Sequence, residues 1–334
     1  MSSIAIGTVI FVAAGLFLLN RGPSTPSNFE TGSAGKEISI SIPNGATGSD
    51  IALLLFKKGV VASSLAFFNA AVVDPKSSTI APGVHRIALH IPAEEALAQL
   101  LDTKRIENLI KVPEGVWTTE LLTLMQAEGF SRPELESALK KITAPKGFTG
   151  TEGIFFPAQY SFAKGTSALT ALQNMVNRFG DEAKNAGLSA GSKEFSSMQL
   201  LTIASLVQAE GDESDFAKIS QVVRNRLKIG MPLQFDSTIH YIRKTRGQVY
   251  LSSDATKISS DYNTYLHYGL PPGPINSPGK LAIKAAMNPE PGPWLYFITV
   301  KPRDTRFTDS DAEFLRWKSE YEANLRAGAF GSKS

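Results

Sequence analysis

The chain has 334 residues, a length that corresponds to about two domains. Its 43% hydrophobic and 19% charged residues are typical of a folded globular protein and exclude disorder for most of its length. The absence of cysteine excludes disulfides, thiolate metal ligands and cysteine nucleophiles, and the net charge of +3 argues against a general nucleic-acid-binding protein.

The N-terminus carries an apolar run from Ile4 to Leu19, sixteen residues without a charge. As a helix it is about 24 Å long, slightly short of a hydrocarbon core of about 30 Å. A cleaved signal peptide is disfavoured, because no positive charge precedes the run and no small-residue cleavage site clearly ends it. We therefore predict a transmembrane anchor over residues 1–20. A flexible linker follows over 21–36, where Gly, Pro, Ser, Thr and Asn dominate.

An internal repeat follows the linker. Residues 42–60 (IPNGATGSDIALLLFKKGV) align without a gap with residues 112–130 (VPEGVWTTELLTLMQAEGF), at an offset of 70. Each copy predicts a strand, a Pro-x-Gly turn and an amphipathic helix that ends at a glycine. Further helices are predicted near residues 62–71, 93–101 and 133–141, and a further strand near 83–89. The strand-helix-helix-strand order resembles a LysM-like glycan-binding module, which we place at 37–104, with the partial repeat at 105–150.

Several common chemistries leave no trace in the sequence. The four histidines lack the spacing of a metal site, and neither a phosphate-binding loop nor a Gly-x-Ser-x-Gly elbow occurs. We therefore predict no metal site and no cofactor. Ser277-Pro278 is interpreted as a helix N-cap followed by proline in the first turn.

One carboxylate stands out in the C-terminal half. Residues 196–210 predict a helix with a capping box at Ser196 and a stop at Gly211. Its last residue, Glu210, shares the apolar face of this helix, whose nearest members are Ile203, Leu206 and Val207. Apolar surroundings and the negative end of the helix dipole both raise a carboxyl pKa, as a general acid requires. The alternative is that Glu210 merely begins an acidic loop and points into water.

The sequence after this helix is locally basic and aromatic. A helix is predicted over 216–229, capped by Ser214. Between residues 222 and 257, seven basic residues face two acidic ones, an excess that suits either an anionic partner or a solvated face. The aromatic residues of 262–268 could stack on sugar rings or belong to the core. Residues 294–300 (WLYFITV) predict a buried strand.

Four blocks of this half carry a family resemblance: LTIASLVQAEG, VVRNRLKIGMPLQFDSTIHY, YNTYLHYGLPPGPINSPG and AAMNPEPGPWLYF. Together with the upstream GTEGIFFPAQYSF, they resemble the MltG/YceG-like family of endolytic murein transglycosylases. The resemblance implies a single-pass membrane protein of α+β class. Its catalytic domain, which we place at 151–328 before a tail at 329–334, is expected on the extracytoplasmic side of the cell membrane. The implied partners are peptidoglycan glycan strands and membrane-bound peptidoglycan synthases, with no nucleic acid.

The implied reaction cleaves the MurNAc–GlcNAc β-1,4 bond within glycan strands during cell wall synthesis and leaves 1,6-anhydro-MurNAc ends. One carboxyl group can suffice, because the sugar's own C6 hydroxyl replaces the second group of an ordinary glycosidase. The family block Ala-Ser-Ile-Val-Glu-x-Glu has Gln208 at its first Glu position here, so Glu210 carries the catalytic role. Ser237 stands where the family usually has proline.

Five further residues are expected to position the sugar or to stabilise an oxocarbenium-like state: Gln234, Asp236, Tyr262, Asn263 and Tyr265. Each has a structural alternative, such as capping a loop. Two other functions stay open: a muramidase that uses Glu213 or Asp236 as a second carboxylate, and a non-catalytic, membrane-anchored peptidoglycan-binding protein in which Gln208 marks a decayed site.

Overall fold

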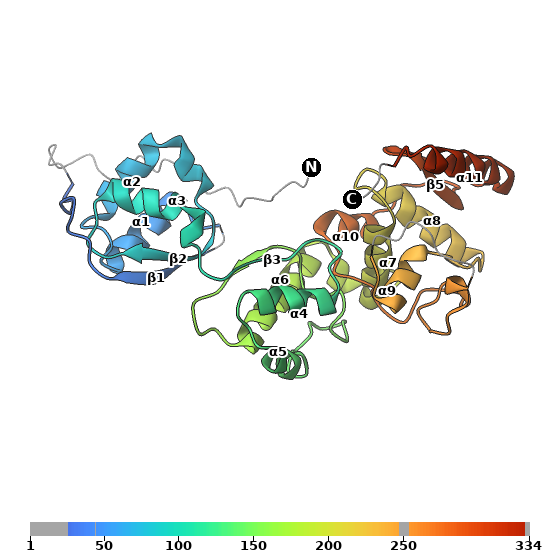
Figure 1. Ribbon diagram of the computed structural model, residues 1–334, viewed down its shortest axis with the longest axis horizontal. Helices are drawn as coiled ribbons and strands as arrows, with labels where there is room; N and C mark the ends of the chain where they lie inside the picture. Colours follow the sequence, from blue (N-terminus) through green and yellow to red (C-terminus); the bar gives the residue numbers. More distant parts are fainter. Residues whose placement is uncertain (1–25, 44, 247–253, 331–334) are drawn as a thin grey trace. The chain divides into compact units, whose positions relative to one another are not determined.

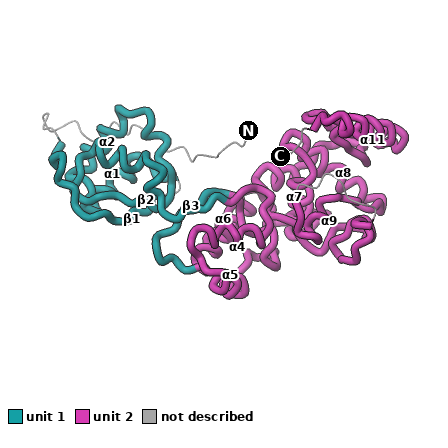
Figure 2. Tube along the Cα trace, in the orientation of Figure 1, with its two compact units in different colours: residues 1–111, 158–167 teal, residues 112–157, 168–334 magenta. Residues whose placement is uncertain are grey.

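The structure is a computed structural model that describes residues 26–330, except 44 and 247–253. The chain forms two compact units (Figure 2). Unit 1 comprises residues 1–111 and 158–167, and unit 2 comprises residues 112–157 and 168–334. Helices and three two-stranded antiparallel sheets make up the fold, which confirms the α+β class.

The predicted anchor lies outside the described residues, together with the start of the predicted linker. Within the part of the chain that the structure describes, no helix combines the length and the apolar character needed to cross a bilayer.

Unit 1 begins with the predicted order of strand, helix, helix and strand (Figure 1). Its elements are β1 (Glu37–Ile42), α1 (Gly48–Lys57), α2 (Ser64–Val73), β2 (Gly83–Ala88) and α3 (Ala93–Leu101). Strands β1 and β2 pair antiparallel, with Ile40 opposite His85. Alternation along β1 buries Ile40 and Ile42 and leaves Ser39 and Ser41 exposed, so one face of the sheet joins the core of helices α1 to α3.

The internal repeat is confirmed in local structure. Helix α4 (Thr118–Ala127) begins and ends 70 residues after α1. The turns before the two helices also match, because Gly45 and Gly115 adopt φ values of +76° and +73°, which only glycine adopts without strain. The second copy continues with α5 (Arg132–Leu139), and its strands β3 (Leu109–Lys111) and β4 (Gln159–Ser161) pair antiparallel within unit 1.

Unit 2 is mainly helical and is built around one helix. Besides α4 and α5, its elements are α6 (Ala168–Asn185), α7 (Ser197–Glu210), α8 (Phe216–Lys228), α9 (Asp236–Arg243), α10 (Lys280–Met287), β5 (Tyr296–Lys301), β6 (Asp304–Thr308) and α11 (Asp311–Arg326). Helix α7 packs against α8 and α10, and its residues 200–207 are all buried. The position of its last residue, Glu210, is therefore fixed by the core.

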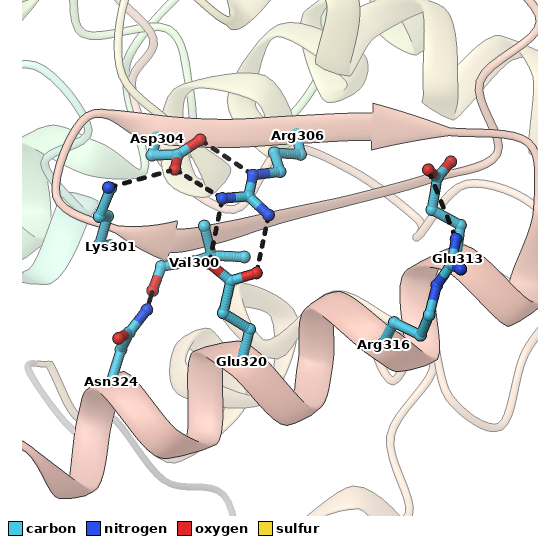
Figure 3. A network of polar contacts seen from close by, with 8 residues as sticks. All are labelled: Val300, Lys301, Asp304, Arg306, Glu313, Arg316, Glu320 and Asn324. Carbon is cyan, nitrogen blue, oxygen red and sulfur yellow. Dashed lines mark hydrogen bonds and ion pairs between the residues drawn. The ribbon is translucent and has the colours of Figure 1, made fainter.

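Polar contacts attach helix α11 to the β5–β6 hairpin (Figure 3), beside the stacked rings of Tyr296 and Phe314. Arg306 of β6 pairs with Asp304 at 2.9 Å and with Glu320 of α11 at 2.8 Å. The amide of Asn324 donates to the Val300 carbonyl at 2.8 Å. The prediction of a buried strand here is wrong in one respect, since only Val300 of β5 is buried. A two-stranded hairpin covered by one helix leaves residues 296–299 half-exposed and Lys301 exposed.

Two predicted helix caps are also wrong. Helix α8 begins after Asp215, not Ser214, and no side chain caps it. Helix α10 begins after Gly279, because Ser277 is instead held in a β-bridge with Val116. Its N–H donates to the Val116 carbonyl, and its carbonyl accepts from the Gly115 N–H.

Candidate active site

The candidate site is built on the C-terminal end of α7. The predicted capping box is present at its other end, where Ser196 and Gln199 bond each other's backbone N–H groups. Ile203, Leu206 and Val207 have no exposed surface, whereas Glu210 itself is half-buried. Its carboxyl group therefore lies at the edge of the core, within reach of a ligand.

Glu210 is bonded to the start of another helix. The hydroxyl of Ser237, in the first turn of α9, donates to Glu210 Oε1. The backbone N–H of Ser237 also bonds this carboxylate. Proline at this position could offer neither donor. The departure from the family pattern noted in the sequence thus supplies the direct partner of the acid.

The surroundings of Glu210 make it a weak acid, as predicted. Burial raises its pKa to about 7, and the nearby negative charge of Asp236 acts in the same direction. The hydrogen bonds from Ser237 and the positive charge of Arg226 act against this rise. Near neutral pH, a large fraction of Glu210 is protonated and able to donate its proton.

Asp236 lies beside Glu210 and is held by a tyrosine. Tyr265 donates its hydroxyl to Asp236 Oδ1. Asp236 is exposed, and Tyr265 is half-buried. Burial, followed by the hydrogen bond to Asp236, raises the pKa of Tyr265, so its hydroxyl stays a donor at all working pH values. The pair presents a carboxylate that is oriented and accessible.

The backbone of Gln234 and Phe235 is fixed to the loop that carries Tyr265. Gln234 is exposed in a left-handed conformation, with φ of +51°, and its N–H donates to the Thr264 carbonyl at 3.0 Å. The N–H of Phe235 donates to the Thr264 hydroxyl at 2.9 Å. Thr264 therefore ties together the two segments that carry the polar groups.

Asn263 shapes this loop from inside. Its side chain has no exposed surface, and its amide donates to the carbonyls of Thr256 and Ile258 at 2.9 and 2.8 Å. Its side-chain oxygen accepts from the Tyr265 N–H at 2.9 Å. The structural alternative, a residue that caps a loop, matches this geometry, and the amide has no donor left for a ligand.

Tyr262 belongs to a neighbouring cluster around Tyr241, which lies further along α9. Its ring centroid lies 5.1 Å from that of Tyr241. The Tyr241 hydroxyl donates to Glu152 at 3.2 Å, and the other Glu152 oxygen accepts from the Thr118 N–H at 3.0 Å. Burial raises the pKa of both Glu152 and Tyr262. The structure thus brings Asp236 and Tyr265 together beside Glu210, which bonds Ser237. Tyr262 contacts Tyr241, which lies one helical turn after Ser237 on α9.

Arg226 is a residue near Glu210 that the sequence analysis did not assign to the site, and its positive charge lowers the pKa of Glu210. It is 7% exposed, and its guanidinium donates to the carbonyls of Leu295 and Leu233 at 2.6 and 2.5 Å. These bonds fix the segment that precedes Gln234. Its spacing of three and four residues from the buried Val223 and Val222 could have indicated its burial. Ser237 was marked only by its departure from the family pattern, and Thr264, Tyr241 and Glu152 gave no signal in the sequence.

Among the described residues, no three His, Asp or Glu side chains form a cluster suited to a metal ion.

Comparison with known proteins finds one matching family model and several similar proteins. The model of the YceG-like family matches residues 40–320. The chain is 29% identical over 306 residues to the endolytic murein transglycosylase of Bacillus subtilis strain 168, covering 85% of this chain and 84% of that protein. It is 28% identical over 299 residues to the endolytic murein transglycosylase of Streptococcus pneumoniae D39, of which it spans 54%. The crystal structure of a YceG-like protein from Listeria monocytogenes shares its fold, with a TM-score of 0.55 and 24% identity over 84% of this chain and 98% of that one.

Proposed function

The chain belongs to the YceG-like family, and we infer that it is an endolytic murein transglycosylase. Such an enzyme is a lyase that cuts the MurNAc–GlcNAc β-1,4 bond within peptidoglycan glycan strands. The observation that carries this inference is the half-buried carboxyl of Glu210, whose pKa of about 7 suits a proton donor. The Bacillus subtilis relative, named endolytic murein transglycosylase, supports this inference, because the similarity extends over most of both chains.

In the proposed mechanism, Glu210 donates its proton to the glycosidic oxygen while the bond to C1 of MurNAc breaks. The C6 hydroxyl of the same MurNAc attacks C1 and closes the 1,6-anhydro ring. The resulting carboxylate takes the proton of that hydroxyl, so that Glu210 returns to its starting state and no water is consumed. The hydroxyl is already close to C1, which is why a second catalytic carboxylate is not needed.

The other polar groups have supporting roles in this proposal. Asp236, held by Tyr265, places a negative charge beside the oxocarbenium-like state and helps keep Glu210 protonated. Gln234 is exposed and available for a sugar hydroxyl, and Tyr262 offers a ring beside Tyr241. Asn263 acts indirectly, as a positioning residue for Tyr265.

A two-carboxylate muramidase is the second candidate, because Asp236 lies close enough to Glu210 to raise its pKa. The two reactions differ in their product. We expect the full chain to release fragments that end in 1,6-anhydro-MurNAc, lighter by one water than hydrolysed ends in the mass spectrum. Reducing ends that contain the additional water identify the muramidase instead. A digest without new chain ends identifies a binding protein.

We also propose that residues 4–19 anchor the protein in the cell membrane and that both units lie outside the cytoplasm, where the substrate is. The uninterrupted apolar run supports the anchor. Membrane-bound peptidoglycan synthases are the proposed partners, and the strand-helix-helix-strand order of unit 1 supports a LysM-like role in glycan binding. The full chain should sediment with membranes, and residues 36–334 should not.

A further inference from the structure

The basic residues between 222 and 257 separate into distinct groups in the structure. Arg226 is buried. Three others pair with carboxylates: Arg224 with Glu194, Arg246 with Glu120 and Lys257 with Asp254. In the described residues, which include every Asp and Glu of the chain, Lys228, Arg243 and Lys244 have no carboxylate within 4.0 Å. Of these three cations, only Lys244 has its charged group fixed by the fold.

Two aromatic rings fix the Lys244 ammonium. Its Nζ lies 3.4 Å from the ring centroid of Tyr241 and 5.4 Å from that of Trp117. Lys244 also closes α9 in a left-handed conformation, with φ of +51°, where glycine is the usual residue. A lysine there costs about 1 kcal/mol relative to glycine. Lys244 is nevertheless exposed, so that a ligand can reach the ammonium.

The carboxylates nearest to Lys244 are occupied by other donors. Glu152 accepts hydrogen bonds from the Thr118 N–H and the Tyr241 hydroxyl. Glu120 accepts from Arg246 through both of its oxygens. The ammonium therefore has no direct anionic partner, although its position is held. An exposed cation of this kind suits a negatively charged ligand.

Helix α9 connects this cation to the candidate active site. Tyr241 follows Ser237 by four residues, so both lie on one face of α9 with a rise of about 6 Å between them. Ser237 bonds Glu210, and Tyr241 lies beneath the ammonium of Lys244. A glycan strand cut at Glu210 extends over several sugars, so we expect the sugars next to the cut bond to reach as far as Tyr241.

We propose that Lys244 binds a carboxylate carried by the glycan strand, close to the bond that is cut. This inference rests on the proposed function. Two sources offer the same chemistry: the lactyl carboxylate of MurNAc that has lost its peptide, and the carboxylates of an attached stem peptide. Lys244 then makes recognition depend on the charge of the strand and not only on its sugar rings.

The test measures binding by the full chain with Glu210→Gln, so that cleavage does not interfere. Three soluble ligands are compared by calorimetry: peptide-bearing glycan strands, strands freed of peptide, and neutral chitooligosaccharide. We expect Lys244→Gln to weaken binding of an anionic strand about tenfold and to change binding of chitooligosaccharide less than about twofold. Lys244→Arg should retain most of the affinity, and Arg243→Gln, which removes the preceding charge, should leave it unchanged.

Each outcome identifies the source or contradicts the proposal. A loss confined to peptide-bearing strands identifies the stem peptide, a loss confined to peptide-free strands identifies the lactyl group, and a loss with both means that the site accepts either carboxylate. The proposal is overturned by unchanged binding, by an equal loss with chitooligosaccharide, or by a Glu210→Gln chain that binds neither anionic strand. Release of 1,6-anhydro ends by the chain with intact Glu210 reports separately on the proposed function.

Discussion

Ser237 donates its hydroxyl to Glu210 and so joins the first turn of α9 to the last turn of α7. The positive end of the α9 dipole and the negative end of the α7 dipole therefore meet at one carboxyl group. Hydrogen bonds to a carboxylate favour its charged form, whereas burial favours its neutral form. The balance between Ser237 and the apolar surroundings keeps this pKa at about 7.

Ser237→Ala should raise the pKa of Glu210, because the carboxylate loses its side-chain donor. A general acid is active in its protonated form, so the alkaline limb of the kcat/KM profile should move to higher pH. The rate at neutral pH should change by less than about tenfold. Ser237→Thr keeps the hydroxyl and should retain the wild-type limb. A profile that does not move in Ser237→Ala would mean that this bond does not tune the acid.

Asp236→Asn should move the alkaline limb of the kcat/KM profile to lower pH. Removal of the negative charge beside Glu210 lowers the pKa of Glu210, so the protonated acid is lost at a lower pH. We also expect kcat/KM at its optimum to fall about tenfold or more, because the oxocarbenium-like state loses a charge that stabilises it. The melting temperature should stay within a few degrees, since Asp236 is exposed. Tyr265→Phe, which leaves the charge but removes its hydrogen bond, should show a smaller loss.

Local patterns in the sequence predicted the local parts of this site well. The capping box of Ser196 and the stop at Gly211 lie within one helix, so its ends could be read directly. The spacing of Glu210 from Ile203, Leu206 and Val207 predicted an acid on an apolar face, and its raised pKa confirms that direction.

Contacts between distant segments decided the rest. Ser237 lies 27 residues from Glu210, and no periodicity connects two positions on different helices. Ser277 resembles an N-cap locally, but its backbone pairs with Val116, and α10 begins only after Gly279. Asn263 is of a residue type that often binds sugars. Only the folded loop reveals that its amide donates to backbone carbonyls of the loop itself.

Asn263→Ala should act on stability and not on one catalytic step. Two backbone carbonyls and the Tyr265 N–H lose their partner in a buried place, so the free energy of unfolding should fall by about 2–3 kcal/mol. Urea titration measures this loss. Asn288→Ala removes an exposed amide and should change stability by less than about 0.5 kcal/mol. If Asn263→Ala keeps full stability and raises only KM, the residue contacts the sugar directly.

Glu210→Gln should lower activity and, at the same time, raise the stability of the folded state above pH 5. Activity should fall about 100-fold or more, because the variant has no proton to donate. In the wild type the pKa of Glu210 is raised from 4.5 to about 7, so the folded state binds its proton more tightly than the unfolded state. Wild-type stability therefore declines as pH rises from about 4.5 to 7, by up to roughly 3 kcal/mol. Glutamine does not titrate, so melting curves should show its advantage growing between pH 5 and pH 8. Parallel curves would contradict the raised pKa.

Gln208→Glu restores the acid that the family block usually has, and it tests whether this site has decayed. The amide of Gln208 donates to Glu114, and its oxygen accepts from the Gly279 N–H at 2.8 Å. Burial and the charge of Glu213 already raise the pKa of Glu114.

A glutamate at 208 removes the donor and adds a third acid, so the free energy of unfolding should fall by about 1–2 kcal/mol at pH 8 and less at pH 5. Ser237 and Asp236, the partners of Glu210, do not involve Gln208, so kcat/KM should stay within about threefold of the wild type. A wild type that cuts no glycan strands, together with a Gln208→Glu variant that does, would instead identify the natural chain as a binding protein that has lost its activity at position 208.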